Sequence, residues 1–281
     1  MEFDDMKQSV ELFSGGGGGT EGLRRAGIET VLAIDSCEVA LAVHRLNHPS
    51  VQSLKLELGG GIETTASIIR EYLDPSKSFH LHGSPPCQAL SNASKSRGNY
   101  REGEGLILVK WFIELVRYMK PDSWSLENVE GIASYFDENS IPYIRVNCSH
   151  YGVPQNRKRI IAGEGFELTP SEASLSFWAA LPHLRQSIAS KGLRIVSRRR
   201  KRGEKPQSYT IDGPSHTITR IPHIIESEET GNIRSLTLEE SATLQGWPSM
   251  KFPSGYTRKD LMIVVGNMIP PPLFENLGRS L

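Results

Sequence analysis

The chain has 281 residues, 38% of them hydrophobic, and its 32 basic residues balance its 32 acidic ones. These totals are typical of an ordinary soluble globular protein with one large domain, or one domain plus a small one. No apolar run approaches the length that spans a bilayer, and the acidic first residues are unlike a secretory leader. The three cysteines show neither metal-ligand spacing nor an even disulfide framework, which favours a reducing compartment.

The first elements follow the order of a nucleotide-binding unit. A short strand over 10–13 leads into the glycines 15–19, which allow a ligand to approach the backbone closely. A helix is expected over 23–26, and a second strand over 30–34 runs directly into Asp35. Strand, glycine turn, helix, strand and acid is the βαβ order. Because no Gly-Lys-Ser/Thr follows the glycines, a ligand that carries adenosine without a phosphate chain is favoured.

A rigid loop places a single cysteine after another strand. The strand-like run 78–82 is followed by two prolines, Pro85 and Pro86, which fix the backbone directly before Cys87. Open α/β sheets bind their ligands at such carboxyl ends of strands. A free cysteine in a turn is the ordinary alternative, but a nucleophile that must meet one atom at a set angle gains from this rigidity.

The middle of the chain is expected to deliver polar groups to the same edge. Residues 91–99 suit a lid or phosphate-contacting loop, and the apolar stripe over 108–119 predicts a core helix. A strand over 123–126 then precedes Glu127, which either caps the next turn or acts as a general acid beside the cysteine.

Two further strands are expected over 141–147 and 159–162. The turn between them carries Arg157 and enters the second strand at Arg159. By themselves, two arginines entering a strand are typical of surface charge.

The character of the sequence changes after Gly165. Residues 166–232 show no sustained period, which predicts an inserted, loop-rich second lobe. From 191 to 205 eight basic residues accompany one acidic residue. That block fits a solvated loop, a surface for polyanionic phosphate, or a nuclear-targeting signal.

Regular structure is expected to return at 236–245. Thr237 and Glu240 have the spacing of a capping box, and Gly246 is placed to end the helix. The run 263–265 is strand-like, and a turn and a final helix are expected after it.

Six motifs in this chain resemble, in order, those of the cytosine-5 DNA methyltransferase family. They are Phe13 to Gly18, Pro85 to Gln88, Glu127 to Val129, Gln155 to Arg159, Arg234 to Pro248, and Gly266-Asn267. The resemblance implies an α/β fold: a Rossmann-like S-adenosylmethionine-dependent methyltransferase domain with a small, loop-rich target-recognition lobe. It divides the chain into a catalytic and cofactor-binding domain (1–165), the recognition lobe (166–232) and a return to the catalytic domain (233–281).

The resemblance also assigns catalytic roles. Cys87 is implied as the thiolate that adds to carbon 6 of cytosine, which makes carbon 5 nucleophilic. Glu127 is implied to hydrogen-bond ring nitrogen 3, and Arg159 to hold the carbonyl oxygen. Asn128 would brace the backbone before the cysteine. Because the target carbon lies inside a base stack, the nucleotide would be flipped out of the duplex.

S-adenosylmethionine is the implied cofactor and double-stranded DNA the implied partner. The implied cofactor-binding residues are Phe13, Gly15, Gly17, Gly18, Asp35, Pro86, Leu106 and Asn267. The implied nucleic-acid-binding residues are Ser91, Arg157, Arg199, Thr217 and Arg220. No metal is expected, because His80 and His82 share a strand face without a third ligand nearby. Cys37 and Cys148 are interpreted as inert.

Three positions depart from the family pattern. Glu11 stands where the family usually has Asp, and Ser36 where an aromatic residue often follows the ribose acid. The usual Gly-Asp pair is missing, and Glu57 is the candidate to replace its contact to adenine. These departures concern the affinity for the cofactor more than the type of reaction.

Three alternatives stay open at this point. A transfer-RNA cytosine-5 methyltransferase shares the Pro-Pro-Cys motif, whereas a catalytically silent DNA-binding relative would not require Cys87, Glu127 and Arg159 together. A nicotinamide dehydrogenase would leave Cys87 unexplained. We expect a monomer without membrane contact, with or without a restriction endonuclease partner. We expect it in the cytoplasm, in a prokaryotic nucleoid or encoded by a virus, or in the nucleus if the source is eukaryotic.

Overall fold

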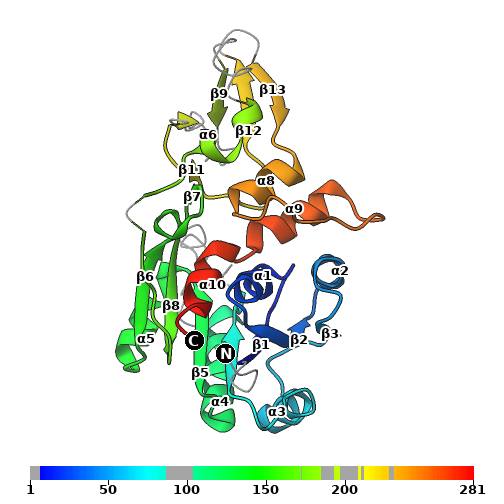
Figure 1. Ribbon diagram of the computed structural model, residues 1–281, viewed down its shortest axis with the longest axis vertical. Coiled ribbons are helices and arrows are strands. Elements are labelled where there is room, and N and C mark those ends of the chain that lie inside the picture. The colour runs from blue at the N-terminus through cyan, green and yellow to red at the C-terminus, as the bar shows by residue number, and fades with distance from the viewer. Residues whose placement is uncertain are drawn as a thin grey trace.

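The structure is a computed structural model that describes residues 7–86, 104–171, 173–184, 193–196, 208–209, 212–227 and 231–281. A seven-stranded sheet forms the larger part, and a four-stranded sheet lies at one end of the long axis (Figure 1). Within the described ranges, no helix combines the length and hydrophobicity that a membrane crossing requires.

The larger sheet carries the carboxyl-end edge that the sequence predicts. Its strands are β1 (Gln8–Leu12), β2 (Glu29–Asp35), β3 (Gln52–Lys55), β4 (Phe79–Gly83), β5 (Ser123–Asn128), β6 (Tyr143–Asn147) and β8 (Lys158–Glu164). The order is β3-β2-β1-β4-β5-β8-β6, with β8 antiparallel to both of its neighbours. Because the order reverses between β1 and β4, their carboxyl ends open at a topological switch point, where such sheets bind ligands. The predicted α/β fold is confirmed.

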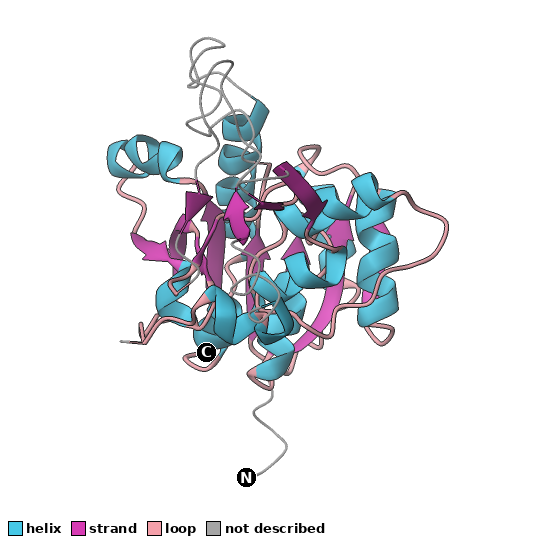
Figure 2. Cartoon of the chain, turned by 90° about the horizontal axis from the view of Figure 1, so that it is seen from above, coloured by secondary structure: helices cyan, strands magenta, loops and turns pink. Residues whose placement is uncertain are grey.

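Helices lie on both sides of the strands (Figure 2). The helices of the described ranges are α1 (Gly18–Arg25), α2 (Glu38–Asn47), α3 (Ile62–Arg70), α4 (Glu104–Met119), α5 (Ala133–Glu138), α6 (Phe177–Ala180), α8 (Leu238–Leu244), α9 (Arg258–Asn267) and α10 (Pro271–Gly278). Two short 3-10 turns are η4 (Glu130–Ile132) and η5 (Cys148–Tyr151).

The two faces of the larger sheet differ in chemistry. One face is apolar: residues such as Val10, Leu12 and Leu81 pack there against α3 and α4. On the other face the alternate residues of β1, β4 and β5 are polar and buried. We call this set the polar ladder: Ser9, Glu11, His80, His82, Ser123 and Ser125. Helices α1 and α10 cover it, with Phe274 of α10 edge-on to His82 at a centroid distance of 4.4 Å.

The second lobe is built from short strands. Its sheet has the order β10 (Ser208–Tyr209), β9 (Leu193–Val196), β12 (Ile224–Ser227) and β13 (Gly231–Ser235), all antiparallel. Strands β7 (Gln155–Asn156) and β11 (Ser215–His216) pair with each other. Strands this short leave little periodicity in a sequence. The exact division of the chain at 166 and 232 stays a prediction.

Two predicted elements need correction. Residues 263–265 are the last turns of helix α9 and not a strand, because Thr257 caps the helix by accepting a hydrogen bond from the backbone N–H of Asp260. Helix α1 begins at Gly18, inside the glycine run, rather than at Leu23. The capping box of Thr237 and Glu240 in α8 is confirmed.

Candidate active site

The glycine loop after β1 is tied directly to Asp35 at the end of β2. The backbone N–H of Gly15 donates to Asp35 Oδ2 at 2.8 Å, and that of Cys37 donates to Oδ1 at 2.8 Å. Phe13 has a φ of 57°, and its ring contacts Trp111 edge-on at 6.2 Å. The predicted aromatic and acidic cofactor groups therefore lie on one loop system at the switch point.

Different structural constraints require glycine at positions 15, 17 and 18 of this loop. A Cβ at Gly15 would meet no atom within 4 Å, so its backbone faces open space, at a φ of 55°. Gly17 also has a positive φ, 88°, and precedes α1. A Cβ at Gly18 would come within 2.1 Å of the Ile269 carbonyl oxygen. Gly15 thus suits a ligand contact, whereas Gly18 is required for packing against the segment between α9 and α10.

The ends of β5 and β8 bring together the predicted catalytic groups that the structure describes. Glu127 Oε1 lies 2.7 Å from Arg159 Nε, and both side chains are nearly buried. This contact does not have the geometry of a directed hydrogen bond. The Ser84 hydroxyl donates to Glu127 Oε2 at 3.3 Å. Asn128 Nδ2 donates to the Pro85 carbonyl at 3.2 Å, which braces the start of the Pro-Pro segment.

Cys87 itself lies outside the described residues, as do Ser91 and Arg199. Pro86 is the last described residue before this gap and is exposed. The other two cysteines differ from each other. Cys37 is exposed, while burial raises the pKa of the Cys148 thiol to about 11. A thiol with so high a pKa is a poor nucleophile at neutral pH.

Arg157 corrects a prediction. It is only 3% exposed, and its guanidinium donates to the carbonyl oxygens of Ile218, Gly266 and Met268 at 3.2–3.3 Å. A guanidinium buried against backbone carbonyls cannot contact a DNA phosphate. The interpretation of the two arginines as surface charge is equally wrong. Arg157 joins the strand region to the lobe and to the end of α9.

The remaining predicted DNA contacts lie beside this junction. Thr217 donates its hydroxyl hydrogen to the Asn156 carbonyl at 2.6 Å. Arg220 is exposed, and the backbone of residues 219–220 packs against Gly266 so closely that a Cβ there would come within 2.3 Å. Asn267, predicted to bind the cofactor, is the exposed last residue of α9. The candidate DNA contacts and this cofactor residue therefore meet at one place.

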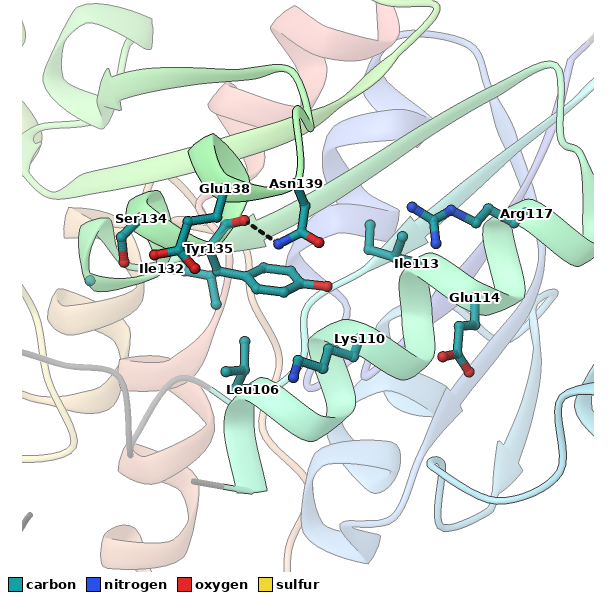
Figure 3. Close-up of a pocket in the computed structure, with 11 residues that line it drawn as sticks. Leu106, Lys110, Ile113, Glu114, Arg117, Ile132, Ser134, Tyr135, Glu138 and Asn139 are labelled. Carbon is teal, nitrogen blue, oxygen red and sulfur yellow. Dashed lines mark hydrogen bonds between the residues drawn. The ribbon is translucent and has the colours of Figure 1, made fainter. Parts of the chain in front are cut away.

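Leu106 lies on α4, the helix whose Trp111 contacts Phe13, and belongs to the same apolar cluster. It is 8% exposed and lines a pocket of about 450 Å³ between α4 and the η4–α5 segment (Figure 3). In this pocket Lys110 Nζ lies 5.8 Å from the centre of the Tyr135 ring. None of the other predicted cofactor residues lines the pocket.

The polar ladder contains groups that the sequence interpretation did not assign. Burial raises the pKa of Glu11 to about 8, against a hydrogen bond from Thr20 that lowers it. Burial lowers the pKa of His80 to about 3, and that of His82 well below its ordinary value. The available signal was the alternation of polar and apolar residues in 8–12 and 79–83, since the central strands of parallel sheets are normally apolar throughout.

Comparisons with known proteins agree with this geometry. The sequence profile of the family described as "C-5 cytosine-specific DNA methylase" matches residues 7–167 and 165–281. The type II methyltransferase M.HgiDI of Herpetosiphon aurantiacus is 26% identical over 98% of this chain and 94% of its own length. M1.HphI of Haemophilus parahaemolyticus is 25% identical over 96% and 85%. The solved structure of the Entamoeba histolytica methyltransferase EhMeth superposes with a TM-score of 0.66 at 17% identity, covering 97% and 96%.

Proposed function

Because this chain belongs to the C-5 cytosine-specific DNA methylase family and is thus a DNA cytosine-5 methyltransferase, we propose that it methylates carbon 5 of a cytosine flipped out of duplex DNA, through a covalent adduct with Cys87. One observation supports the proposal above the others. Glu127 is paired with Arg159 and directly precedes Asn128, which braces the first proline of the Pro-Pro-Cys segment. A binding protein has no need of an acid and a cation at the approach to a cysteine.

The proposed chemistry assigns each group one task. The Cys87 thiolate forms a bond to carbon 6, while Glu127 gives a proton to ring nitrogen 3, so that the ring becomes an enamine with a nucleophilic carbon 5. Arg159 holds the ring carbonyl oxygen. After methylation, loss of the carbon 5 proton to solvent breaks the carbon–sulfur bond, and Glu127 recovers its proton.

The residues of the glycine loop fit S-adenosylmethionine. Gly15 offers open backbone, Asp35 stands at the strand end where a ribose is bound in such folds, and Phe13 offers a ring for adenine. When bound, this cofactor supplies an electrophilic methyl group. Asp35 already accepts two backbone hydrogen bonds, which fix its carboxylate for a ligand contact.

DNA contact is proposed for the lobe side of the site. The candidate contacts are Thr217 and Arg220 from the described part, and Ser91 and Arg199 from outside it. Arg157 is not a candidate, because its guanidinium is buried against backbone carbonyls. Phosphate contacts by the candidate residues would offset the few kcal/mol that flipping a base costs. The recognised base sequence depends on side chains of the lobe that meet groove edges.

A cysteine comparison tests the proposed mechanism. Purified Cys87→Ala should transfer no labelled methyl group to duplex DNA, and should form no denaturant-resistant adduct with duplexes that contain 5-fluorocytosine. Calorimetry should show that Cys87→Ala still binds the cofactor. Cys37→Ser, which alters an exposed thiol, is the matched control and should behave as the unchanged protein. Methyl transfer by Cys87→Ala would contradict the covalent mechanism.

The substrate is tested in the same assay. Duplex DNA of mixed sequence and folded transfer RNA are offered separately, and methylation of the RNA alone would favour the RNA alternative. Sequencing the DNA of cells that express the chain, after a chemistry that distinguishes 5-methylcytosine, would give the recognised sequence. A restriction endonuclease that cuts the same sequence is the proposed partner, and monomeric state is tested by light scattering.

A further inference from the structure

Two side chains at β7 hold both polar backbone atoms of Ile218. Gln155 Oε1 accepts a hydrogen bond from the Ile218 N–H at 2.7 Å, and Arg157 Nη1 donates to the Ile218 carbonyl oxygen at 3.2 Å. Ile218 and Gln155 are fully buried, and Arg157 is 3% exposed. Loss of either bond would therefore leave a buried polar group without a partner. Ile218 belongs to residues 217–220, here called the contact segment, which carry two of the proposed DNA contacts.

The guanidinium of Arg157 also binds the end of helix α9. Arg157 Nη1 donates to the Gly266 carbonyl oxygen at 3.3 Å, and Arg157 Nη2 donates to that of Met268 at 3.2 Å. A guanidinium carries five N–H donors in a rigid planar fork, so one side chain can bind several carbonyl groups at fixed positions. Arg157 thus joins the contact segment to the end of α9 through a single rigid group.

A pair of buried glutamines makes a second connection to the same helix. Gln155 Nε2 donates to the side-chain oxygen of Gln245 at 2.8 Å and to the Leu244 carbonyl oxygen at 3.1 Å. Gln245 Nε2 in turn donates to the Val265 carbonyl oxygen at 2.6 Å. Both glutamine side chains are fully buried. The contact segment is therefore connected to α9 twice, once through Arg157 and once through the two amides.

The contact segment also packs directly against the end of α9. A Cβ at Gly266 would lie 2.3 Å from the carbonyl carbon of Thr219 and 2.4 Å from the backbone nitrogen of Arg220. Two backbones approach so closely only where one residue lacks a side chain. Figure 1 shows β7 and β11, at this junction, between the larger sheet and the sheet of the lobe. The contact segment therefore cannot shift relative to α9 without breaking the buried hydrogen bonds of Gln155 and Arg157.

The end of α9 packs in turn against the glycine loop of the proposed cofactor site. A Cβ at Gly16 would lie 2.5 Å from Val264 Cγ1, and a Cβ at Gly18 would lie 2.4 Å from Met268 Cγ. Met268 thus belongs to both contacts, because its side chain packs on Gly18 while its carbonyl oxygen accepts from Arg157. A continuous set of buried contacts therefore leads from the contact segment to the cofactor loop.

We propose that Gln155 and Arg157 are positioning residues that couple the two proposed ligands, so that cofactor binding at the glycine loop orders the contact segment before DNA arrives. The inference rests on the proposed cofactor and DNA contacts and adds two residues that touch neither ligand. A ligand that fixes one of two connected segments lowers the entropy cost of fixing the other. Such coupling is reciprocal, so DNA on the contact segment strengthens cofactor binding by the same factor.

The test compares Gly266→Ala with Gly60→Ala. A methyl group at position 266 meets the backbone of residues 219–220, whereas one at position 60 meets no atom within 4 Å, and neither glycine has a positive φ. NMR follows hydrogen exchange of the Ile218 N–H with and without S-adenosylhomocysteine, which is the cofactor without its transferable methyl group. In the unchanged protein and in Gly60→Ala, this ligand should slow the exchange about tenfold, a factor typical of coupled sites. In Gly266→Ala the exchange should not respond, although calorimetry still detects the bound ligand.

Arg157→Lys is a second variant that breaks the junction in a different way. Lysine keeps the positive charge but lacks the planar fork, so it cannot hold the carbonyl groups of Ile218, Gly266 and Met268 in the same arrangement. This variant should also lose the response of the Ile218 N–H to S-adenosylhomocysteine. If Arg157→Lys does not fold, Gly266→Ala alone decides the test.

The reciprocal effect is measured on DNA. S-adenosylhomocysteine should tighten binding of the unchanged protein to a duplex with the sequence methylated in expressing cells about tenfold, and Gly266→Ala should bring this ratio close to one. Exchange at Ile218 that does not respond to the bound ligand in the unchanged protein would overturn the proposal. A full response in both junction variants would equally overturn it. Failure of the unchanged protein to bind S-adenosylhomocysteine at all would instead contradict the proposed function, and the inference with it.

Discussion

The two faces of the larger sheet solve the same problem of burial in different ways. The face under α3 and α4 is packed with aliphatic and aromatic side chains, whose contribution depends on buried area and shape. The face under α1 and α10 carries the polar ladder, whose contribution to stability depends on the geometry of its hydrogen bonds. Glu127 follows Ser123 and Ser125 on this second face, since alternate strand residues share a side. The difference suggests that one face supplies stability and the other fixes the strand ends that bear the site.

The largest expected effect tests the apolar face. Phe112 of α4 is fully buried and so close to Gly83 that a Cβ there would lie 2.4 Å from the Phe112 ring. Phe112→Ala should therefore lower the free energy of unfolding by about 3–5 kcal/mol, since the cavity cannot easily collapse. Urea unfolding measures this, with Ile107→Ala as control because Ile107 on the same helix is 59% exposed. A loss below 1 kcal/mol would contradict the assignment of stability to this face.

The second prediction is that the stability contributed by the polar face depends on pH, whereas that of the apolar face does not. Glu11 has a pKa of about 8 in the folded protein and near 4.5 when unfolded, so between these values the folded state binds more protons. Its contribution is thus present at low pH and is lost as pH rises from about 5 toward 8, at most about 1.4 kcal/mol per pH unit. The free energy of unfolding of Glu11→Gln, relative to that of the unchanged protein, should therefore rise by on the order of 3 kcal/mol between pH 5 and pH 7.5.

The contribution of the ladder histidines to stability depends on pH in the opposite direction. Burial lowers the pKa of His80 to about 3, so its contribution is lost as pH falls below 6.5. This term is common to Glu11→Gln and the unchanged protein and cancels in their difference, which urea unfolding at several pH values would measure. Phe112→Ala should show the same loss at each pH. A pH-independent gain for Glu11→Gln would contradict the assignment of pH sensitivity to the ladder.

Much of this molecule could be predicted from local sequence. The strand before the glycines, the acid at Asp35 and the capping box of Thr237 are short-range patterns with a direct structural meaning. What could not be predicted depends on distant partners. Arg157 and Arg159 look alike in the sequence, and only the carbonyl oxygens of residues 218, 266 and 268 make the first a buried structural group.

The same limit explains the other two misses. The β-branched residues of 263–265 favour a strand by propensity, but the Thr257 cap and packing against α8 and α2 stabilise a helix instead. The polar ladder joins positions 11, 82 and 125, which are neighbours only through the register of β1, β4 and β5. A single sequence reports that each is polar within a strand, and does not report that they lie side by side on one face of the sheet.

The smallest expected effect concerns one link of the ladder. His80→Leu leaves the Ser123 hydroxyl buried without its imidazole partner, and Ser123→Ala leaves His80 Nδ1 without its hydroxyl, so each should cost about 1–3 kcal/mol. The double variant removes both groups and should cost less than the sum, because no orphaned partner remains at that link. Ser67→Ala, on the exposed surface of α3, should instead add to His80→Leu without coupling. Additive losses for the His80 and Ser123 variants would mean that packing, and not hydrogen bonding, determines what the polar face contributes to stability. The contrast between the two faces would then be one of composition alone.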